Sequence, residues 1–192
     1  MKSFSQLTLA AAFIAVFSST AFAAPETFVI DGTHTKPRFS YNHLGYSTQL
    51  SRFDKATGTI VLDKEAKTGS VDVTIDMTSV NTGSDLFNGH IQGADFFDTA
   101  KYPTATFKST KVNFVGDKPS TVEGNLTIKG VTKPVTLTLS SFQEMQHPML
   151  KKDAIGANAS TVVKRSDFNA SKYVPYVGDD VTIDIAVEAI NQ

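Results

Sequence analysis

The feature that most limits the fold of this chain is the alternation of apolar and polar residues across residues 122–139. Successive side chains of a β-strand point to opposite faces, so a period of two residues gives one apolar face and one polar face. We interpret the segment as a β-hairpin broken at 130–134, with an inward face formed by Leu126, Ile128, Val135, Leu137 and Leu139. An isolated hairpin is marginal in water, so this face needs more sheet or a cargo to cover it.

Similar extended patterns occur along most of the chain. The alternation is clearest at 71–77 and 181–189, and further extended segments are predicted at 27–30, 34–43, 50–63, 104–115 and 155–163. Pro37 removes a backbone donor from the segment 34–43, which predicts an edge position or a bulge there. Residues 81–98 break the pattern and predict a short helix, with its N-cap at Asn81 or Ser84, followed by a loop.

Antiparallel strands that follow one another and carry one polar face close into a barrel or pack as a sandwich. Several segments are longer than an average strand, and a twisted sheet of long strands tends to curl. We therefore predict an all-β fold, an antiparallel up-and-down barrel of about eight strands with one short capping helix. No internal repeat and no domain boundary is visible, so residues 24–192 are expected to form a single domain.

Composition excludes several function classes. The chain has 192 residues and a net charge of -1, and it contains no basic tract. This balance argues against a nucleic acid or an anionic membrane surface as the main partner. Because the chain contains no cysteine, disulfides, thiolate catalysis and cysteine-based metal sites are excluded.

The N-terminus has the pattern of a secretory signal peptide. Lys2 is followed by an apolar run at 7–17 and by the small-x-small sequence Ala21-Phe22-Ala23. This pattern predicts that residues 1–23 are removed after Ala23. The apolar run is short for a bilayer span, and no other hydrophobic segment follows, so the mature protein is expected to be periplasmic and not membrane-spanning.

A barrel of this size has two options for its interior. Its own side chains can fill it, or it can hold one small ligand. Inward positions such as Phe39, Met77 and Phe107 could pack as a solid core, or they could line an elongated apolar tunnel. Periodicity alone leaves both options open.

Several motifs resemble a known family. Asp31-x-x-His34 is followed by Phe39-x-x-x-His43-Leu44-Gly45-Tyr46-Ser47, then by Ala94-Asp95-Phe96-Phe97-Asp98, Lys101-Tyr102-Pro103-x-Ala105-x-Phe107 and Leu126-Thr127-Ile128-x-Gly130-Val131-Thr132-Lys133-Pro134-Val135. These motifs, in this order, resemble the YceI-like family of periplasmic proteins, and the resemblance covers essentially the whole mature chain. It implies an extended lipocalin-like barrel that carries a long isoprenoid or similar amphiphile, without catalysis.

Together, the alternation and the resemblance give a list of expected ligand-binding wall residues. The list is Phe39, Tyr41, Phe53, Ile60, Leu62, Ile75, Met77, Phe107, Leu126, Ile128, Leu137, Leu139, Ile183 and Ile185, with Phe96 and Phe97 expected to close one end. The expected partner is an isoprenoid, of the quinone or prenyl phosphate type, or another long-chain amphiphile. No catalytic residue, metal or cofactor is expected, apart from the bound lipid itself, and a homodimer is left open.

Three rival interpretations remain at this point. The first is a metal-binding or hydrolytic site built on His34, His43 and His90, although no H-E-x-x-H or G-x-S-x-G motif is present. The second is a protein-binding module that uses Tyr46, Tyr173 and Tyr176, which are more simply explained as rim packing. The third is a filled barrel, a structural or stress-related protein without a ligand.

Overall fold

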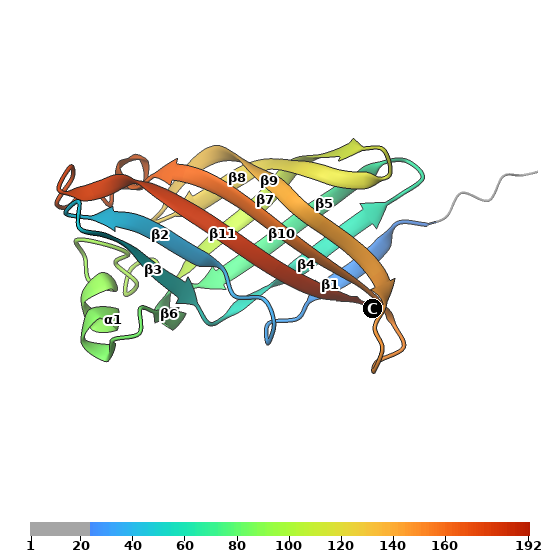
Figure 1. Ribbon diagram of the computed structural model, residues 1–192, viewed down its shortest axis with the longest axis horizontal. Coiled ribbons are helices and arrows are strands. Elements are labelled where there is room, and N and C mark those ends of the chain that lie inside the picture. Colours follow the sequence, from blue (N-terminus) through green and yellow to red (C-terminus); the bar gives the residue numbers. More distant parts are fainter. Residues whose placement is uncertain (1–23) are drawn as a thin grey trace, which may run out of the picture.

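The computed structural model describes residues 24–192, and the expected signal peptide at 1–23 lies outside the described residues. The described chain forms one antiparallel sheet of eleven strands (Figure 1). The strands are β1 (Glu26–Ile30), β2 (Arg38–His43), β3 (Ser47–Phe53), β4 (Ala56–Asp63), β5 (Thr68–Asp76), β6 (Val80–Asn81), β7 (Thr104–Val115), β8 (Lys118–Ile128), β9 (Val131–Gln146), β10 (Asp153–Lys164) and β11 (Val177–Asn191). Its helices are α1 (Asp85–Ile91) and the short 3-10 turns η1 (Met77–Ser79) and η2 (Arg165–Phe168).

Eight of these strands close into a barrel. From β4 to β11, each strand of the barrel pairs with the next in the order β4-β5-β7-β8-β9-β10-β11, and β1 lies between β4 and β11. At this seam Phe28 is opposite Ile60 on one side and Asn191 on the other. The predicted closed eight-stranded antiparallel barrel with one short α-helix is confirmed.

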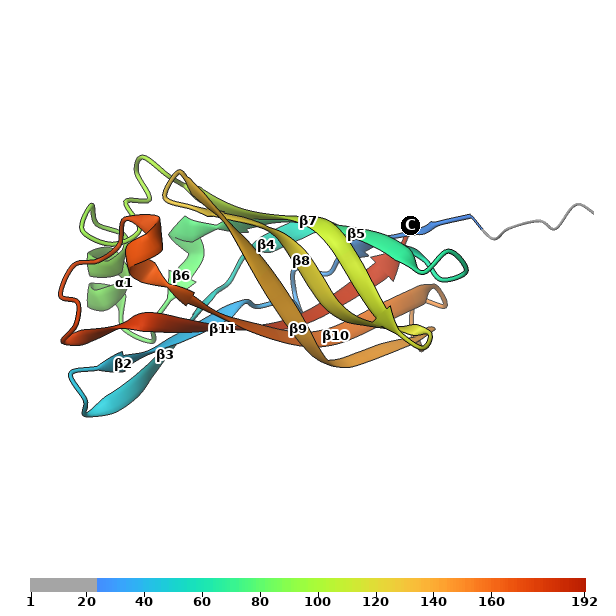
Figure 2. The ribbon, with the colours of Figure 1, turned by 90° about the horizontal axis from the view of Figure 1, so that it is seen from above.

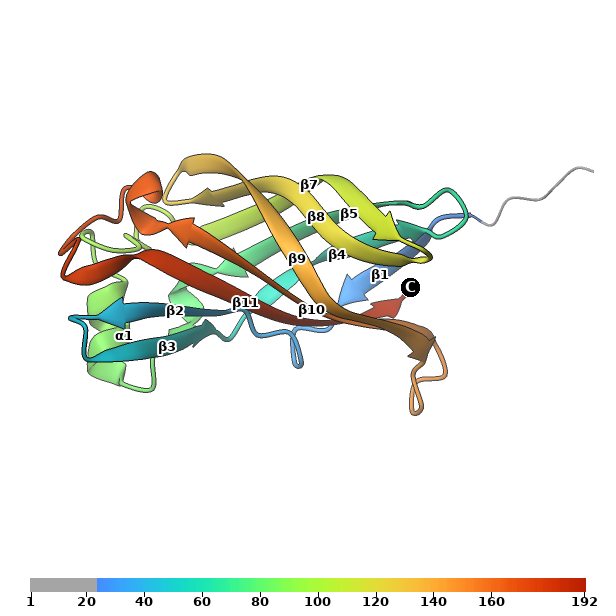
Figure 3. The same cartoon turned by 45° about the horizontal axis from the view of Figure 1, so that its top comes forward.

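The remaining three strands branch from β11. Only the last residues of β11 pair with β1, while the earlier residues Val177–Asp184 pair with β2, and β3 and β6 follow in order. Figure 2 shows the β2–β3 hairpin diverging from the rest of the sheet at the end that carries α1. Figure 3 shows β9, β10 and β11 crossing obliquely in front of β4 and β5, which is the strand tilt that barrel closure requires.

Two segments that were predicted as continuous are divided. Residues 34–43 contain a turn before β2, so Pro37 lies just outside the strand, and its carbonyl accepts a hydrogen bond from Phe53 N at 2.9 Å. Residues 50–63 are divided at Asp54 and Lys55 into β3 and β4. The division allows β3 to pair with the branch while β4 enters the closed barrel.

The hairpin at 122–139 also differs from its prediction in one respect. The turn consists of Lys129 and Gly130, both with positive φ, and β9 resumes at once with Val131 opposite Ile128. Pro134 is therefore inside the strand, not at its break. Proline has no backbone N–H to donate to a neighbouring strand. This is tolerated at Pro134 because the pairing of β9 with β10 ends at Thr138, so β10 needs no hydrogen bond from Pro134.

The helix α1 and its loop cover one end of the barrel. Ser84, one of the two predicted N-cap residues, caps the helix by accepting a hydrogen bond from Phe87 N. The turn between β2 and β3 and the connection between β10 and β11 lie at the same end, which we call the α1 end (Figure 1). The C-terminus lies at the opposite end, the C-terminal end. Across residues 24–192, no helix has both the length and the apolar character needed to cross a membrane.

Candidate ligand-binding cavity

The barrel encloses an apolar cavity of about 350 Å³. This volume lies within the range of roughly 300–1,000 Å³ that is common for small-molecule sites. All sixteen predicted wall and end residues line it: Phe39, Tyr41, Phe53, Ile60, Leu62, Ile75, Met77, Phe96, Phe97, Phe107, Leu126, Ile128, Leu137, Leu139, Ile183 and Ile185. Their role as ligand contacts stays a prediction.

The strands of the cavity wall differ in how deeply their inward residues are buried. Inward residues of β4, β7 and β8, such as Ile60, Phe107 and Leu126, are buried against their neighbours. Inward residues of β9 and β11, such as Leu137 and Ile183, are only half-buried although they line the interior. Val71, Val73 and Ile75 on β5 are also half-buried lining residues, so the unfilled space is bordered by β5 as well as by β9 and β11.

The C-terminal half of the cavity is closed by a tightly packed cluster. Phe28 and Ala189, from the two strands of the seam, are almost completely buried there, together with Ile30, Leu62 and Ile155. Some of these side chains also line the cavity, where they form its apolar floor.

The α1 end is closed by aromatic side chains. Phe97 packs edge-on against Phe39, with ring centroids 5.7 Å apart, and lies 5.6 Å from the ring of Phe53. Phe96 contacts the His90 ring at 5.0 Å and the Tyr173 ring at 6.2 Å. These contacts fit the predicted closing role of Phe96 and Phe97, and they place Tyr173 on the cavity lining and not in a separate surface patch.

Arg165 is a lining residue that the sequence analysis missed. Its guanidinium donates hydrogen bonds to four backbone carbonyls, those of Ala170, Lys172, Val177 and Gly178. Burial lowers the pKa of Arg165, although the nearby carboxylate of Asp179 opposes the shift. The residue follows β10 in the turn η2, outside any alternating pattern, so periodicity gave no signal for it.

Tyr41 is the neighbouring polar group on the wall. Burial raises the pKa of its phenol, and the positive charge of Arg165 partly opposes this shift. His43 and His90 also line the cavity, whereas no aspartate or glutamate is found among its lining residues in the described chain.

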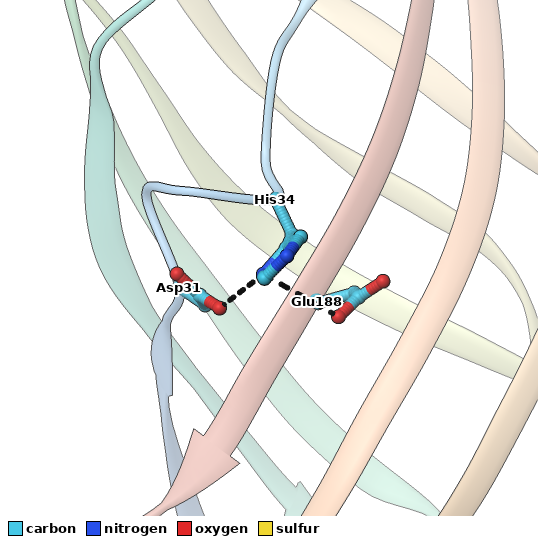
Figure 4. A group of neighbouring side chains, drawn as sticks. All are labelled: Asp31, His34 and Glu188. Atoms are coloured by element: carbon cyan, nitrogen blue, oxygen red, sulfur yellow. Dashed lines mark hydrogen bonds and ion pairs between the residues drawn. The ribbon is translucent and has the colours of Figure 1, made fainter.

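His34 lies elsewhere, in the turn between β1 and β2 (Figure 4). Its Nδ1 is 2.6 Å from Asp31 Oδ2 and 4.0 Å from Glu188 Oε2 on β11. Hydrogen bonds from Thr33 and His34 hold the pKa of Asp31 well below its ordinary value, and Asp31 in turn raises the pKa of His34. Asp31 and His34 therefore form a hydrogen bond within this turn.

The histidines do not form one site. Among residues 24–192, the group with metal-ligand spacing is Asp31, His34 and Glu188, and it contains neither His43 nor His90. His34 is exposed in the turn, whereas His43 and His90 line the cavity. The metal-binding or hydrolytic site suggested for these three histidines is therefore not assembled by the fold.

Fold and cavity together define a class of protein: an antiparallel β-barrel that encloses an apolar space large enough for a small ligand, as lipocalins do. A model of the YceI-like domain matches residues 28–189. The chain is 37% identical over 183 residues to Protein YceI of Escherichia coli O6:H1, covering 92% of this chain and 95% of that protein. The chain belongs to the YceI-like family.

Solved structures agree with this assignment. The crystal structure of the Campylobacter jejuni YCEI protein has a TM-score of 0.68 at 31% identity and covers 79% of this chain and 90% of its own. A polyisoprenoid binding domain from Saccharophagus degradans has a TM-score of 0.66 at 20% identity, covering 86% of this chain and 98% of its own. At that identity the second likeness shows the shared fold alone.

Proposed function

We propose that this protein binds a long-chain isoprenoid, of the quinone or prenyl phosphate type, or a similar single-chain amphiphile inside the barrel. The observation that carries the proposal is the continuous apolar lining of an unfilled cavity, from the cluster at Phe28 and Ala189 to the aromatic closure at Phe97. Membership of the YceI-like family and the structural likeness to a polyisoprenoid binding domain support it.

The energetics of such binding are favourable. Each buried methylene contributes about 0.8 kcal/mol, so roughly ten sequestered carbons give about 8 kcal/mol before association costs are subtracted. A longer chain inserted more deeply reaches micromolar affinity or better. The unfilled cavity is what distinguishes this function from a filled structural barrel, because a solid core would leave no room for an alkyl chain.

The biological role that follows is sequestration or carriage of this lipid through the aqueous periplasm. The expected signal peptide at 1–23 directs the chain there. A lipid tail enclosed by the barrel is kept out of water between two membranes. The proposal assigns no catalytic residue and no metal, and it leaves open whether two copies associate.

Native mass spectrometry of protein purified without detergent tests the proposal. We expect a complex of one protein with one lipid, either co-purified or formed by incubation with a long-chain quinone or a prenyl phosphate. The added mass should disappear under denaturing conditions, which excludes a covalent modification. A spectrum that shows only the free protein after incubation with both lipids would contradict the proposal.

A further inference from the structure

The connection between β9 and β10 projects from the C-terminal end of the barrel. The two strands pair with each other up to Gln146 and Asp153, so residues 147–152 leave the sheet, and we call them the β9–β10 tip. Figure 1 and Figure 3 show this orange segment lying apart from the β4–β5 and β7–β8 turns at the same end. The tip therefore stands free on the surface of the barrel.

The tip is held in one shape by hydrogen bonds within it. His147 Nδ1 accepts hydrogen bonds from Met149 N and Leu150 N, each at 3.2 Å. Lys151 N donates to His147 O at 2.9 Å, and His147 N donates to Lys152 O at 2.7 Å. The backbone of the turn thus satisfies much of its own hydrogen bonding, which lowers the cost of placing it against an apolar surface.

Two large apolar side chains extend from this turn into solvent. Met149 is 84% exposed and Leu150 is 57% exposed, and Met145 on the preceding part of β9 is 57% exposed. A single exposed apolar residue needs no explanation. Here two of them are consecutive on a projecting turn, and methionine adapts readily to irregular apolar surroundings. This arrangement favours contact with an apolar phase that can surround the turn.

The charged side chains beside this apolar pair are cationic. Lys151 and Lys152 are exposed, and among residues 24–192 neither ammonium has a hydrogen bond or an ion pair. Asp153 is the one acidic residue of 147–153, so with His147 neutral this segment has a net charge of +1, from two lysines and one aspartate. A lysine without a partner meets an external anion without first breaking an ion pair.

Carboxylates of the neighbouring strands and turns are engaged with other lysines. Lys64 lies 3.4 Å from Glu26 and 2.7 Å from Glu144, and Lys67 lies 3.2 Å from Asp117. Their negative charge is thus partly compensated within the protein. An anionic surface that approaches this end therefore meets the two unpaired lysines of the projecting turn.

The size and shape of the tip favour a bilayer over another protein. A stable protein interface buries roughly 800 Å² on each partner and requires matching shapes, which a projecting turn with two apolar side chains does not provide. A bilayer accepts such a turn without a matching shape, because apolar side chains enter the head-group boundary while lysines stay at the level of the phosphates. Anionic lipids attract those lysines further.

We propose that the β9–β10 tip docks the protein on a bilayer surface that contains anionic phospholipid. Met149 and Leu150 enter the head-group boundary, and Lys151 and Lys152 pair with lipid phosphates. The net charge of -1 on the whole chain argues against an extended basic contact surface, so the attachment is local and sensitive to salt. It is independent of the cavity and of the lipid proposed to bind there.

A tryptophan reporter tests which part of the protein touches the bilayer. The chain contains no tryptophan, so Leu150→Trp gives a single reporter at the tip, and Leu86→Trp gives a matched control on α1, where Leu86 is 88% exposed. With vesicles of phosphatidylcholine and phosphatidylglycerol, we expect the emission of Leu150→Trp to shift to the blue and to be quenched when the acyl chains are brominated. The emission of Leu86→Trp is expected to stay unchanged. No shift in Leu150→Trp, or an equal shift in both variants, would overturn the inference.

Vesicle co-sedimentation of proteins without a reporter supplies the second measurement, because tryptophan itself favours membrane interfaces. We expect the double variant Met149→Ser/Leu150→Ser to bind the same vesicles at least about tenfold more weakly than the unaltered protein. The double variant Lys151→Gln/Lys152→Gln is expected to bind about tenfold more weakly at low salt. Vesicles of phosphatidylcholine alone should remove the difference between this lysine variant and the unaltered protein.

The charge-matched control is Lys111→Gln/Lys133→Gln. These exposed lysines lie on β7 and β9, so the control lowers the net charge equally without changing the tip, and we expect binding within about twofold of the unaltered protein. Equal weakening in the two lysine variants would show an effect of net charge alone and overturn the inference. An unaltered protein that does not sediment with anionic vesicles at low salt would also overturn it. Native mass spectrometry of the cavity ligand is independent of these outcomes, so the docking tip and the lipid-binding function fail separately.

Discussion

At the scale of single residues, the turn between β1 and β2 is held by a small polar network. Asp31 accepts hydrogen bonds from Thr33 N, Thr33 Oγ1 and the His34 ring. Its backbone N–H donates to the carbonyl of Glu188, which fixes the turn against β11. The network thus lies against residues 185–188 of β11, on the edge away from β10, where neither β1 nor β2 pairs with the strand.

This network predicts a pH dependence. The pKa of His34 is raised in the folded protein, mainly by its hydrogen bond with Asp31. The stability that this interaction contributes is fully present when the pH is below 6.5, the ordinary histidine pKa, and it is lost as the pH rises through the raised pKa of the folded state. The lowered pKa of Asp31 contributes stability above its ordinary value of 3.8, which is lost only as the pH falls through the lower folded pKa. The Asp31–His34 interaction therefore contributes most to the stability of the fold between pH 3.8 and pH 6.5.

We expect Asp31→Asn to lower the pKa of His34 toward 6.5, measured by NMR titration of the imidazole resonances. Glu188, which also raises this pKa, and Lys36, which lowers it, remain in place. The control is Asp117→Asn, because the side chain of Asp117 is 93% exposed and pairs with Lys67. A His34 pKa that is the same in Asp31→Asn as in the wild type would show that Asp31 is not the cause of the shift.

At the scale of elements, α1 is fastened to the barrel by few contacts. Its residue Asn88 accepts hydrogen bonds from Thr82 N at 2.8 Å and Thr82 Oγ1 at 2.9 Å, just after β6. The neighbouring Ile91 is buried in the cluster with Phe39 and Phe53. An element with few buried contacts opens locally at a lower free energy than the barrel strands. On the proposed lipid-binding function, we therefore expect the ligand to enter and leave past α1.

We expect Asn88→Ala to increase the rate of lipid dissociation about tenfold while changing the global unfolding free energy by about 1 kcal/mol or less. Stopped-flow displacement of a fluorescent lipid measures the rate, and hydrogen exchange across α1 measures the opening. Leu86→Ala is the control, because Leu86 is on the same helix and is 88% exposed. If dissociation is equally slow in Asn88→Ala and in the control, ligand passes elsewhere.

The wall positions could be predicted from the sequence, whereas the features that depend on distant contacts could not. Alternation decides which face a side chain occupies, so Ile75, Leu137 and Ile183 were placed correctly on the interior. Arg165 follows a strand in a 3-10 turn, where no period of two applies. The β2–β3–β6 branch arises because β11 changes partner along its length, a pairing that local sequence does not encode.

The position of the turn before Pro134 is another feature that the local sequence did not predict. A proline suggested a break, but the chain turns earlier, where Lys129 adopts a positive φ next to Gly130. The proline is accommodated only because β10 does not pair with that part of β9. The absence of pairing at Pro134 depends on where β10 ends along β9, and the proline itself gives no sign of it.

At the scale of the whole molecule, stability and binding place different demands on the interior. Inward residues of β4, β7 and β8 are mostly buried, while those of β5, β9 and β11 leave a lining that the protein itself does not cover. A side chain that fills this space should therefore remove binding without harming the fold, which is the opposite of what a mutation in a solid core does.

The variant Ala157→Phe on β10 tests this expectation, because Ala157 lines the cavity opposite Val187. We expect at least about a tenfold loss of affinity for a prenyl lipid, with the melting temperature of the free protein unchanged or higher. Val162→Phe on the same strand is the control, because Val162 is 61% exposed and does not line the cavity. A folded Ala157→Phe protein that binds with wild-type affinity would show that the ligand does not occupy this space.

The seam of the barrel joins β1 to β11, since Phe28 is paired with Asn191 and Ile30 with Ala189. Among the strand pairs of residues 24–192, this closure has the largest sequence separation, and contacts of this kind form late and slowly. The ring therefore closes only when β1 and β11 are both available to pair, and every other pair of neighbouring barrel strands can form before that step.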